Sequence, residues 1–217
     1  MLDLDAEEQR VLGTLIEKQL ATPQYYPLTL SALVQGCNQS TSREPVTSYS
    51  ESEVRDVLAR LREKQLLRTI LPTHGRSVDR YGHRLDEQIT LIKEEVALLG
   101  VLMLRGPQTE AELKSRTERL ADWEAPDTTA SVLERLVNKP EPLARNVGRG
   151  PGQSQDRWIH LLGATDVDPI PFRAELSPHT AHNSAEKPAA PGRIDELEAR
   201  VAALEEQIAE LKRELGA

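Results

Sequence analysis

The stretch from residue 66 to residue 85, LLRTILPTHGRSVDRYGHRL, has the pattern of a β-hairpin. Two short segments with Leu, Ile, Val and Tyr flank a tip that contains Gly, as two paired strands do. The stretch contains one acid, Asp79, and four arginines, Arg68, Arg76, Arg80 and Arg84. Because alternate residues of a strand share a face, we expect Arg80 and Arg84, four residues apart, to point to the same side.

Three helices are predicted before this hairpin. The first runs from about Asp5 to Leu20, where apolar residues recur at helical spacing, and the second begins near Thr29. The third begins with the capping-box pattern SESE at residues 50–53 and ends near Lys64. Three helices followed by a hairpin is the order of a winged helix, a relative of the helix-turn-helix. Its third helix can enter a major groove while the hairpin lies along the DNA backbone.

The same order recurs in the following residues. LGTL at 12–15 is echoed by LGVL at 99–102, and VLARL at 57–61 is echoed by VLERL at 132–136. The second hairpin is PLARNVGRGPGQSQDRWIHLLG, at residues 142–163, with a glycine-rich tip. An internal duplication is the simplest account. We therefore expect a mainly α fold with small β-hairpins, an α+β fold of tandem winged-helix domains.

Four regions are predicted along the chain. Residues 1–88 and 89–163 form the two winged-helix domains, and residues 164–191 form a flexible linker, because five prolines lie there among Ser, Asn, Ala and His. Residues 192–217 form a coiled-coil helix.

Apolar residues in the last region alternate in steps of three and four. They are Ile194, Leu197, Val201, Leu204, Ile208, Leu211 and Leu215. β-Branched residues at one heptad position and Leu at the other favour a parallel two-stranded coiled coil. We expect this helix to join two copies of the chain into a homodimer. The alternative is a helix docked on its own domain.

The formal net charge of −8 is unevenly distributed. Residues 164–217 hold 6 Lys/Arg against 11 Asp/Glu, a net charge of −5. Residues 60–84 hold seven basic and two acidic residues, a local charge of +5. Binding to polyanions follows the local charge more than the total, so the hairpin region can favour nucleic acid in an acidic protein.

Composition argues against several classes of protein. The single cysteine, Cys37, excludes an internal disulfide framework, and neither a signal peptide nor a run of about 20 apolar residues is present, so we expect a soluble cytoplasmic protein that does not enter membranes. Cys37, His74 and His83 lack metal-ligand spacing, and we expect a buried thiol and two surface imidazoles. No catalytic or phosphate-binding motif is found, so we expect no enzyme and no cofactor.

Two motifs, CNQSTSREPV at residues 37–46 and GRSVDRYGHRL at residues 75–85, give the chain a family resemblance. Together with the capped helix between them, they resemble the YceH-like family of bacterial proteins. The resemblance covers roughly residues 1–163 and implies tandem winged-helix domains, but it brings no established activity. Ser40, Thr41 and Ser42 stand where a lysine is common in that family, which removes one candidate phosphate contact.

Nine residues are predicted to contact DNA: Arg43, Ser52, Arg55, Ala59, Arg62, Arg68, Arg76, Arg80 and Arg84. The hairpin arginines would follow a phosphate backbone, unless they form a solvated surface paired with Glu63, Asp79 and Asp86. Arg55 and Arg62 are seven residues apart on the third helix and share a face with Ser52 and Ala59. Arg43 reaches a phosphate or else pairs with Glu44 or Glu51.

The leading hypothesis is a dimeric protein that binds double-stranded DNA and regulates transcription. Acidic residues at the start of the third helix oppose this, because Glu51, Glu53 and Asp56 repel phosphates. The rival hypothesis is a protein–protein interaction module, similar in architecture to partners of bacterial chromosome-condensing complexes; this rests on fold analogy. We expect the second winged helix to pack on the first or to bind protein more often than DNA.

Overall fold

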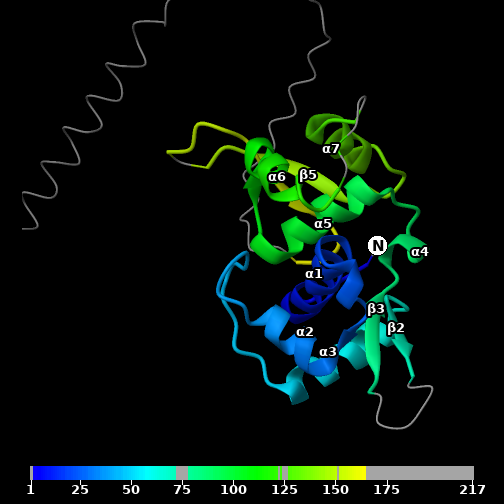
Figure 1. Cartoon of the computed structure of the whole chain (residues 1–217). Helices are drawn as coiled ribbons and strands as arrows, with labels where there is room; N and C mark the ends of the chain where they lie inside the picture. The colour runs from blue at the N-terminus through cyan, green and yellow to red at the C-terminus, as the bar shows by residue number, and fades with distance from the viewer. Residues whose placement is uncertain (1, 72–77, 122, 124–126, 151, 165–217) are drawn as a thin grey trace, which may run out of the picture. The chain divides into compact units, whose positions relative to one another are not determined.

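The computed structural model describes residues 2–71, 78–121, 123, 127–150 and 152–164 (Figure 1). These residues all fall within one compact unit. Arg76 and His74 lie outside the described residues, as do the predicted linker after Ala164 and all seven predicted coiled-coil positions.

The first half of the described chain contains a helical group and a small sheet. Its elements are α1 (Ala6–Ala21), the 3-10 turn η1 (Pro23–Tyr25), β1 (Leu28–Thr29), α2 (Leu30–Cys37), α3 (Glu51–Glu63), β2 (Leu67–Ile70), β3 (Arg80–His83) and α4 (Leu85–Gln88). The three predicted helices and the hairpin are present. The strand β1 and the short helix α4 were not predicted.

The second half repeats this order. Its elements are α5 (Lys93–Arg105), β4 (Gln108–Thr109), α6 (Glu110–Thr117), α7 (Thr129–Val137), β5 (Ala144–Gly148) and β6 (Arg157–His160). The predicted α+β class is confirmed: helices combine with two antiparallel sheets of three strands, in the orders β1-β3-β2 and β4-β6-β5. None of the described helices has both the length and the apolar character needed to span a bilayer.

Local side-chain caps determine where the helices begin. Asp5 Oδ1 accepts a hydrogen bond from Glu8 N at 2.8 Å, and Glu8 Oε2 accepts one from Asp5 N at 2.9 Å. Ser50 and Glu53 form the same reciprocal pair at the start of α3. Thr29 caps α2. These contacts satisfy amide groups that have no partner within the first turn of a helix.

The two halves meet where α1 packs against α5, side by side at the centre of Figure 1. Gly13 and Gly100, from the repeated LGTL and LGVL segments, lie in this contact. A methyl group on Gly100 would lie 2.6 Å from Ile16 Cγ2, and one on Gly13 would lie 2.9 Å from Leu104 Cγ. The glycines therefore allow a close helix approach. Because the halves share one hydrophobic core, their division into separate domains at residue 88 stays a prediction.

The repeat extends to individual hydrogen bonds. Arg80 Nη1 donates to Pro27 O at 2.8 Å in the first half, and Arg157 Nη1 donates to Pro107 O at 2.8 Å in the second. Each bond joins the first residue of a hairpin strand, β3 or β6, to the segment just before the short edge strand. This equivalence supports the inferred internal duplication.

Two buried histidines form a further equivalent pair at the ends of β3 and β6. His83 Nδ1 accepts from Leu85 N, and His160 Nδ1 accepts from Leu162 N, both at 3.3 Å. Burial lowers the pKa of each imidazole to about 4, so both are neutral at pH 7. The expectation that His83 is a surface imidazole is wrong, because only 2% of it is exposed. No group of three possible metal ligands occurs among the described residues.

Candidate nucleic-acid interface

Strand register places the hairpin arginines on one face of the first sheet. Arg68 pairs with Gly82 and Ile70 pairs with Arg80, on the face opposite the buried core residues. Arg84 follows β3, where its amide donates to Leu66 O at 2.9 Å and continues the ladder, so it has the same alternation as Arg80. We call Arg68, Arg80 and Arg84 the arginine face.

One carboxylate, on Glu87 of α4, neutralises part of this face. Arg84 Nε donates to Glu87 Oε2 at 2.7 Å, and Arg68 Nη1 lies 3.9 Å from Glu87 Oε1. Glu87 was not among the predicted partners. Among those that were, Asp86 instead lies 3.6 Å from His83 Nδ1. Three guanidinium groups against one carboxylate leave the face with a charge of 3 − 1, or +2.

Arg80 differs from its neighbours in the charge around it. Its side chain is exposed, and within the described part of the chain it makes no ion pair, only the bond to Pro27 O. A guanidinium has five N–H donors in a rigid fork, so most of its hydrogen-bonding capacity is available to a ligand. Arg80 is therefore the strongest single candidate for a phosphate contact.

Gly82 lies beneath the side chain of Arg68 and close to the hydroxyl of Tyr26. A methyl group on Gly82 would lie 2.9 Å from Arg68 Nε and 3.1 Å from Tyr26 Oη, so a larger residue here would displace the Arg68 side chain. Tyr26 Oη accepts from His83 N at 2.7 Å, and burial raises the pKa of this phenol to about 12. The sequence pattern did not indicate this contact of Tyr26 with β3, because Tyr26 lies outside the hairpin.

The predicted face of α3 is open to solvent. Ser52, Arg55, Ala59 and Arg62 are all exposed. Arg55 Nη2 lies 3.7 Å from Glu51 Oε2, and both side chains are more than half exposed. Arg62 Nη2 donates to Thr69 Oγ1 at 2.8 Å, which links the end of α3 to β2. Helix and hairpin are thus held together by a side chain of the candidate site.

Acidic groups accompany these residues at the start of α3. Glu51, Glu53 and Asp56 are exposed. Hydrogen bonds from the Ser50 hydroxyl and amide lower the pKa of Glu53, so it stays ionised at neutral pH. The first turns of α3 are therefore a mixed surface rather than a cationic one.

Two further cations of the basic region face α1 and not an external ligand. Arg60 Nη2 pairs with Glu7 Oε2 at 2.6 Å, and Lys64 Nζ pairs with Glu8 Oε2 at 2.6 Å. Lys139 and Glu95 repeat the second pair at 3.2 Å in the second half. The local charge of +5 counted along the sequence therefore overstates the charge available at the surface.

The prediction that Arg43 contacts a phosphate is wrong for this structure. Its side chain has no exposed area, and it forms two hydrogen bonds to Glu17, at 2.7 and 3.1 Å, and two to Gly36 O. Burial opposes the charge of Glu17, but the hydrogen bonds and charge of Arg43 lower its pKa overall. Arg43 fastens the loop between α2 and α3 to α1.

The neighbouring motif residues hold the same loop. Asn38 Nδ2 donates to Tyr49 O at 2.7 Å, and Asn38 Oδ1 accepts from Tyr49 N at 2.8 Å. Glu44 N donates to Leu104 O at 2.9 Å, which ties the loop to α5. Cys37 is buried, as expected, and burial raises the pKa of its thiol. The motif is thus explained by loop architecture.

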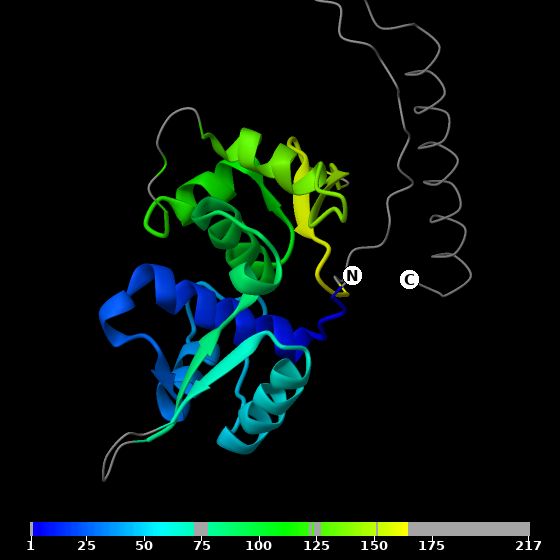
Figure 2. The same cartoon turned by 90° about the vertical axis from the view of Figure 1, so that its right-hand side faces the viewer.

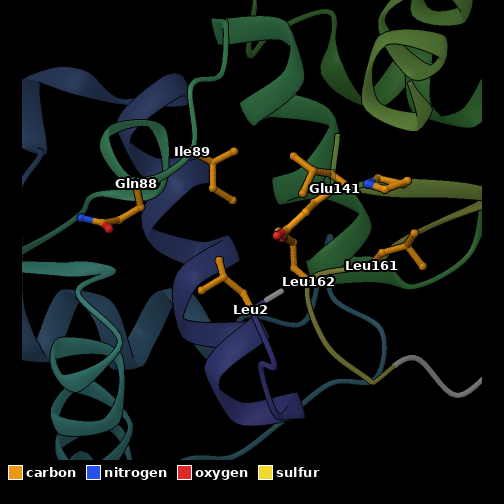
Figure 3. Close-up of a pocket in the computed structure, with 8 residues that line it drawn as sticks. Leu2, Gln88, Ile89, Glu141, Leu161 and Leu162 are labelled. Atoms are coloured by element: carbon orange, nitrogen blue, oxygen red, sulfur yellow. The ribbon is translucent and has the colours of Figure 1, made fainter. Parts of the chain in front are cut away.

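Two pockets offer little evidence for a small-molecule site. The pocket in Figure 3 has a volume of about 240 Å³ and is lined mostly by aliphatic side chains such as Leu2, Ile89 and Leu162. This volume is below the roughly 300–1,000 Å³ of most ligand pockets. A pocket beside α6 and the start of α7 has about 570 Å³, but three carboxylates, one lysine and one tryptophan line it with two threonines. No histidine, cysteine or serine is among the described residues that line either pocket.

Comparison with known proteins places the chain in a family. A family model described as "Protein of unknown function, DUF480" matches residues 4–153. A UPF0502 protein of Pseudomonas savastanoi pv. phaseolicola is 45% identical over 97% of this chain and 93% of the relative. UPF0502 proteins of Mesorhizobium japonicum and Cellvibrio japonicus are each 42% identical, over 97% and 96% of this chain and 93% and 91% of the relatives. The chain therefore belongs to the DUF480 (UPF0502) family, in agreement with its resemblance to YceH-like proteins.

Proposed function

We propose that this protein binds double-stranded DNA through its first half and regulates transcription in the cytoplasm as a dimer of tandem winged helices. The observation that carries the proposal is the arginine face, with three guanidinium groups and one carboxylate. In both halves, the element order of a helix, a short strand, two further helices and a hairpin supports the winged-helix interpretation.

The ion pairs on the arginine face are weak enough for a phosphate to replace them. The side chains of Arg68, Arg84 and Glu87 are 44%, 39% and 45% exposed. Ion pairs at such exposure contribute only about 0–1 kcal/mol to stability. A DNA phosphate in place of Glu87 would also release a condensed counterion, which adds favourable entropy at low salt.

The α3 face would then supply contacts in the major groove. Arg55 is the residue best suited to base recognition, because an arginine can bond O6 and N7 of guanine with two N–H groups. Ser52 and Ala59 are small enough to let the helix approach the base edges. Arg62, through its bond to Thr69, would keep α3 and the hairpin in one fixed geometry on the duplex.

The dimeric part of the proposal depends on the heptad pattern of residues 192–217. Two copies joined there would present two DNA-binding halves at a high effective concentration, which strengthens binding without any new contact. Mass measurement of residues 1–163 against the full chain tests this part. The same oligomeric state in both would contradict it.

One observation favours a second function, a protein–protein interaction module. Glu51, Glu53 and Asp56 are exposed on the first turns of α3, where they repel phosphates and suit a basic protein partner. In this alternative, the arginine face and α3 would together form a surface of mixed charge for another protein.

Binding of a labelled duplex at a series of salt concentrations distinguishes the two functions. The proposal predicts micromolar or tighter binding at low salt. The logarithm of the association constant should fall linearly with the logarithm of the salt concentration. Arg80→Ala combined with Arg84→Ala should flatten this slope by about two units. The matched control is Arg145→Ala with Arg149→Ala, two exposed arginines of the second hairpin.

The outcomes separate clearly. Loss of slope in the first double variant, with an unchanged slope in the control, supports DNA binding by the arginine face. An equal loss of slope in both double variants would mean that overall charge, and not the arginine face, determines binding. An absence of duplex binding at low salt, together with a protein partner that co-purifies and is lost with Glu51→Lys, would favour the interaction module.

A further inference from the structure

Exposed apolar side chains are concentrated on the first hairpin. Seven large apolar residues of the described chain are exposed, and three of them border the hairpin tip: Ile70 at 41%, Leu71 at 69% and Val78 at 57%. The core does not explain them, since the core-facing positions of these strands are occupied by Leu67, Tyr81 and other buried residues.

Ile70, and by alternation Val78, lie on the side of the arginine face, whereas Leu71 alternates to the opposite side. Ile70 is the register partner of Arg80 and lies on the same side of the sheet. Leu71 directly follows β2, and Val78 lies two residues before β3. Figure 2 shows the two strands of the hairpin extending away from the helices. The described end of the hairpin thus combines apolar side chains with Arg80, which forms no ion pair within the described residues even though the exposed Asp79 precedes it in the chain.

This combination suits a particular DNA surface. Proteins that bind the minor groove often insert apolar side chains, Leu and Ile among them, between base pairs and so kink the duplex. An arginine beside them is attracted by the strong negative potential of a narrow, A·T-rich minor groove. A hairpin that only followed the phosphate backbone would need the arginines but no exposed Leu or Ile.

We propose that Ile70, Leu71 and Val78 enter the minor groove of A·T-rich DNA and bend it, with Arg80 bound at the same place. This inference rests on the proposed DNA binding and adds the groove, the base composition and the deformation of the duplex. Charge favours DNA over an apolar protein surface, because Ile70 lies on the face of net positive charge and is the register partner of Arg80.

The test compares two labelled duplexes of equal length, one A·T-rich and one G·C-rich, with dyes at both ends. Anisotropy measures affinity, and energy transfer between the dyes measures bending. The variant is Leu71→Ser with Val78→Ser in the full chain, which removes two exposed side chains and leaves every arginine in place. The matched control is Val46→Ser, a valine of the loop between α2 and α3 that is also 57% exposed.

The proposal predicts that the wild-type chain binds the A·T-rich duplex about tenfold more tightly than the G·C-rich duplex and bends it. The Leu71/Val78 variant should lose this preference and the bend but keep the salt slope, and the Val46 variant should keep all three.

If the Leu71/Val78 variant still prefers the A·T-rich duplex and still bends it, this inference is wrong, but the proposed DNA binding is unaffected. Failure of the wild-type chain to bind either duplex would overturn both. If the variant instead changed only the oligomeric mass of the free protein, the apolar residues would belong to a self-association surface and the inference would fail.

Discussion

Glu87 limits DNA binding if the arginine face is the phosphate-binding surface. Glu87→Gln keeps the size of the side chain and removes its charge. Arg84, at 2.7 Å, and Arg68, at 3.9 Å, then lose the one carboxylate that they share. Glu87 is 45% exposed and each pair contributes about 0–1 kcal/mol, so the fold should lose little stability.

The gain in affinity can be estimated from the same contacts. In Glu87→Gln, the ion pairs of Arg68 and Arg84 with Glu87 no longer compete with the DNA phosphates. Losing this competition adds about 1 kcal/mol to the binding free energy, which is roughly a fivefold lower Kd. Each additional phosphate neutralised adds about 0.9 to the steepness of the salt dependence. Because Arg68 and Arg84 already contact phosphates in the wild-type complex, the slope should steepen by less than about one unit, and the main effect is the lower Kd.

The assay is anisotropy of a labelled duplex titrated at several salt concentrations. The matched control is Asp156→Asn on the second hairpin, where Asp156 pairs with Arg149 at 3.0 Å. The side chain of Asp156 is 45% exposed, as is that of Glu87. Both variants change the net charge by the same amount. Equal effects of the two variants would mean that overall charge controls binding, and an unchanged Kd and slope for Glu87→Gln would refute the role assigned to the arginine face.

Three further predictions concern stability. Gly100→Ala introduces a methyl group into the contact between α1 and α5 and should lower the free energy of unfolding in urea by about 2 kcal/mol, whereas an unchanged midpoint would contradict the close helix packing. Arg43→Met removes the buried guanidinium and leaves the largely buried carboxylate of Glu17 with Lys18 as its remaining ion-pair partner, which should cost about 3 kcal/mol in the same assay. A small effect would show that the loop does not depend on the pair of Arg43 and Glu17. His83 and His160 have folded pKa values of about 4, below the usual 6.5, so the unfolded chain binds more protons than the folded chain. The free energy of unfolding should therefore fall as the pH decreases from 6.5 toward 4, by about 2 kcal/mol per histidine at pH 5. An unfolding free energy that stays constant from pH 7 to pH 5 would disprove this.

Local signals account for the parts of the fold that the sequence predicts well. The helices start after Asp5, Thr29 and Ser50 because each of these side chains caps amides within its own first turn. Such contacts span three residues and can be recognised without any tertiary information. The hairpins are also local, since the strands that pair are close in sequence.

The parts that escape prediction depend on distant residues. β1 and β4 contain two residues each and exist only through pairing with β3 and β6, about 50 residues away in sequence. Arg43 pairs with Glu17, 26 positions earlier, and not with a neighbour. The helical spacing of residues in the sequence cannot predict such a contact, because it depends on how α1 packs against the loop between α2 and α3.

In the candidate site, too, contacts between residues close in sequence could be predicted, and those that depend on distant elements could not. Alternation along a strand is enough to predict that Arg80 and Arg84 share a side, and helical spacing is enough to group Arg55 with Arg62. The partner Glu87 follows Arg84 by three residues, a spacing that signals a contact only where a helical turn is expected. Because the four-residue helix α4 has no side-chain cap, this signal is easy to miss.

The internal duplication makes the central claim, DNA binding by the first half alone, directly testable. Hydrogen–deuterium exchange of the full chain, with and without duplex DNA, reports protection in both halves at once. We predict that DNA slows exchange in α3, β2 and β3 and leaves the equivalent elements α7, β5 and β6 unchanged. Equal protection of both halves, or protection confined to the second half, would contradict the account.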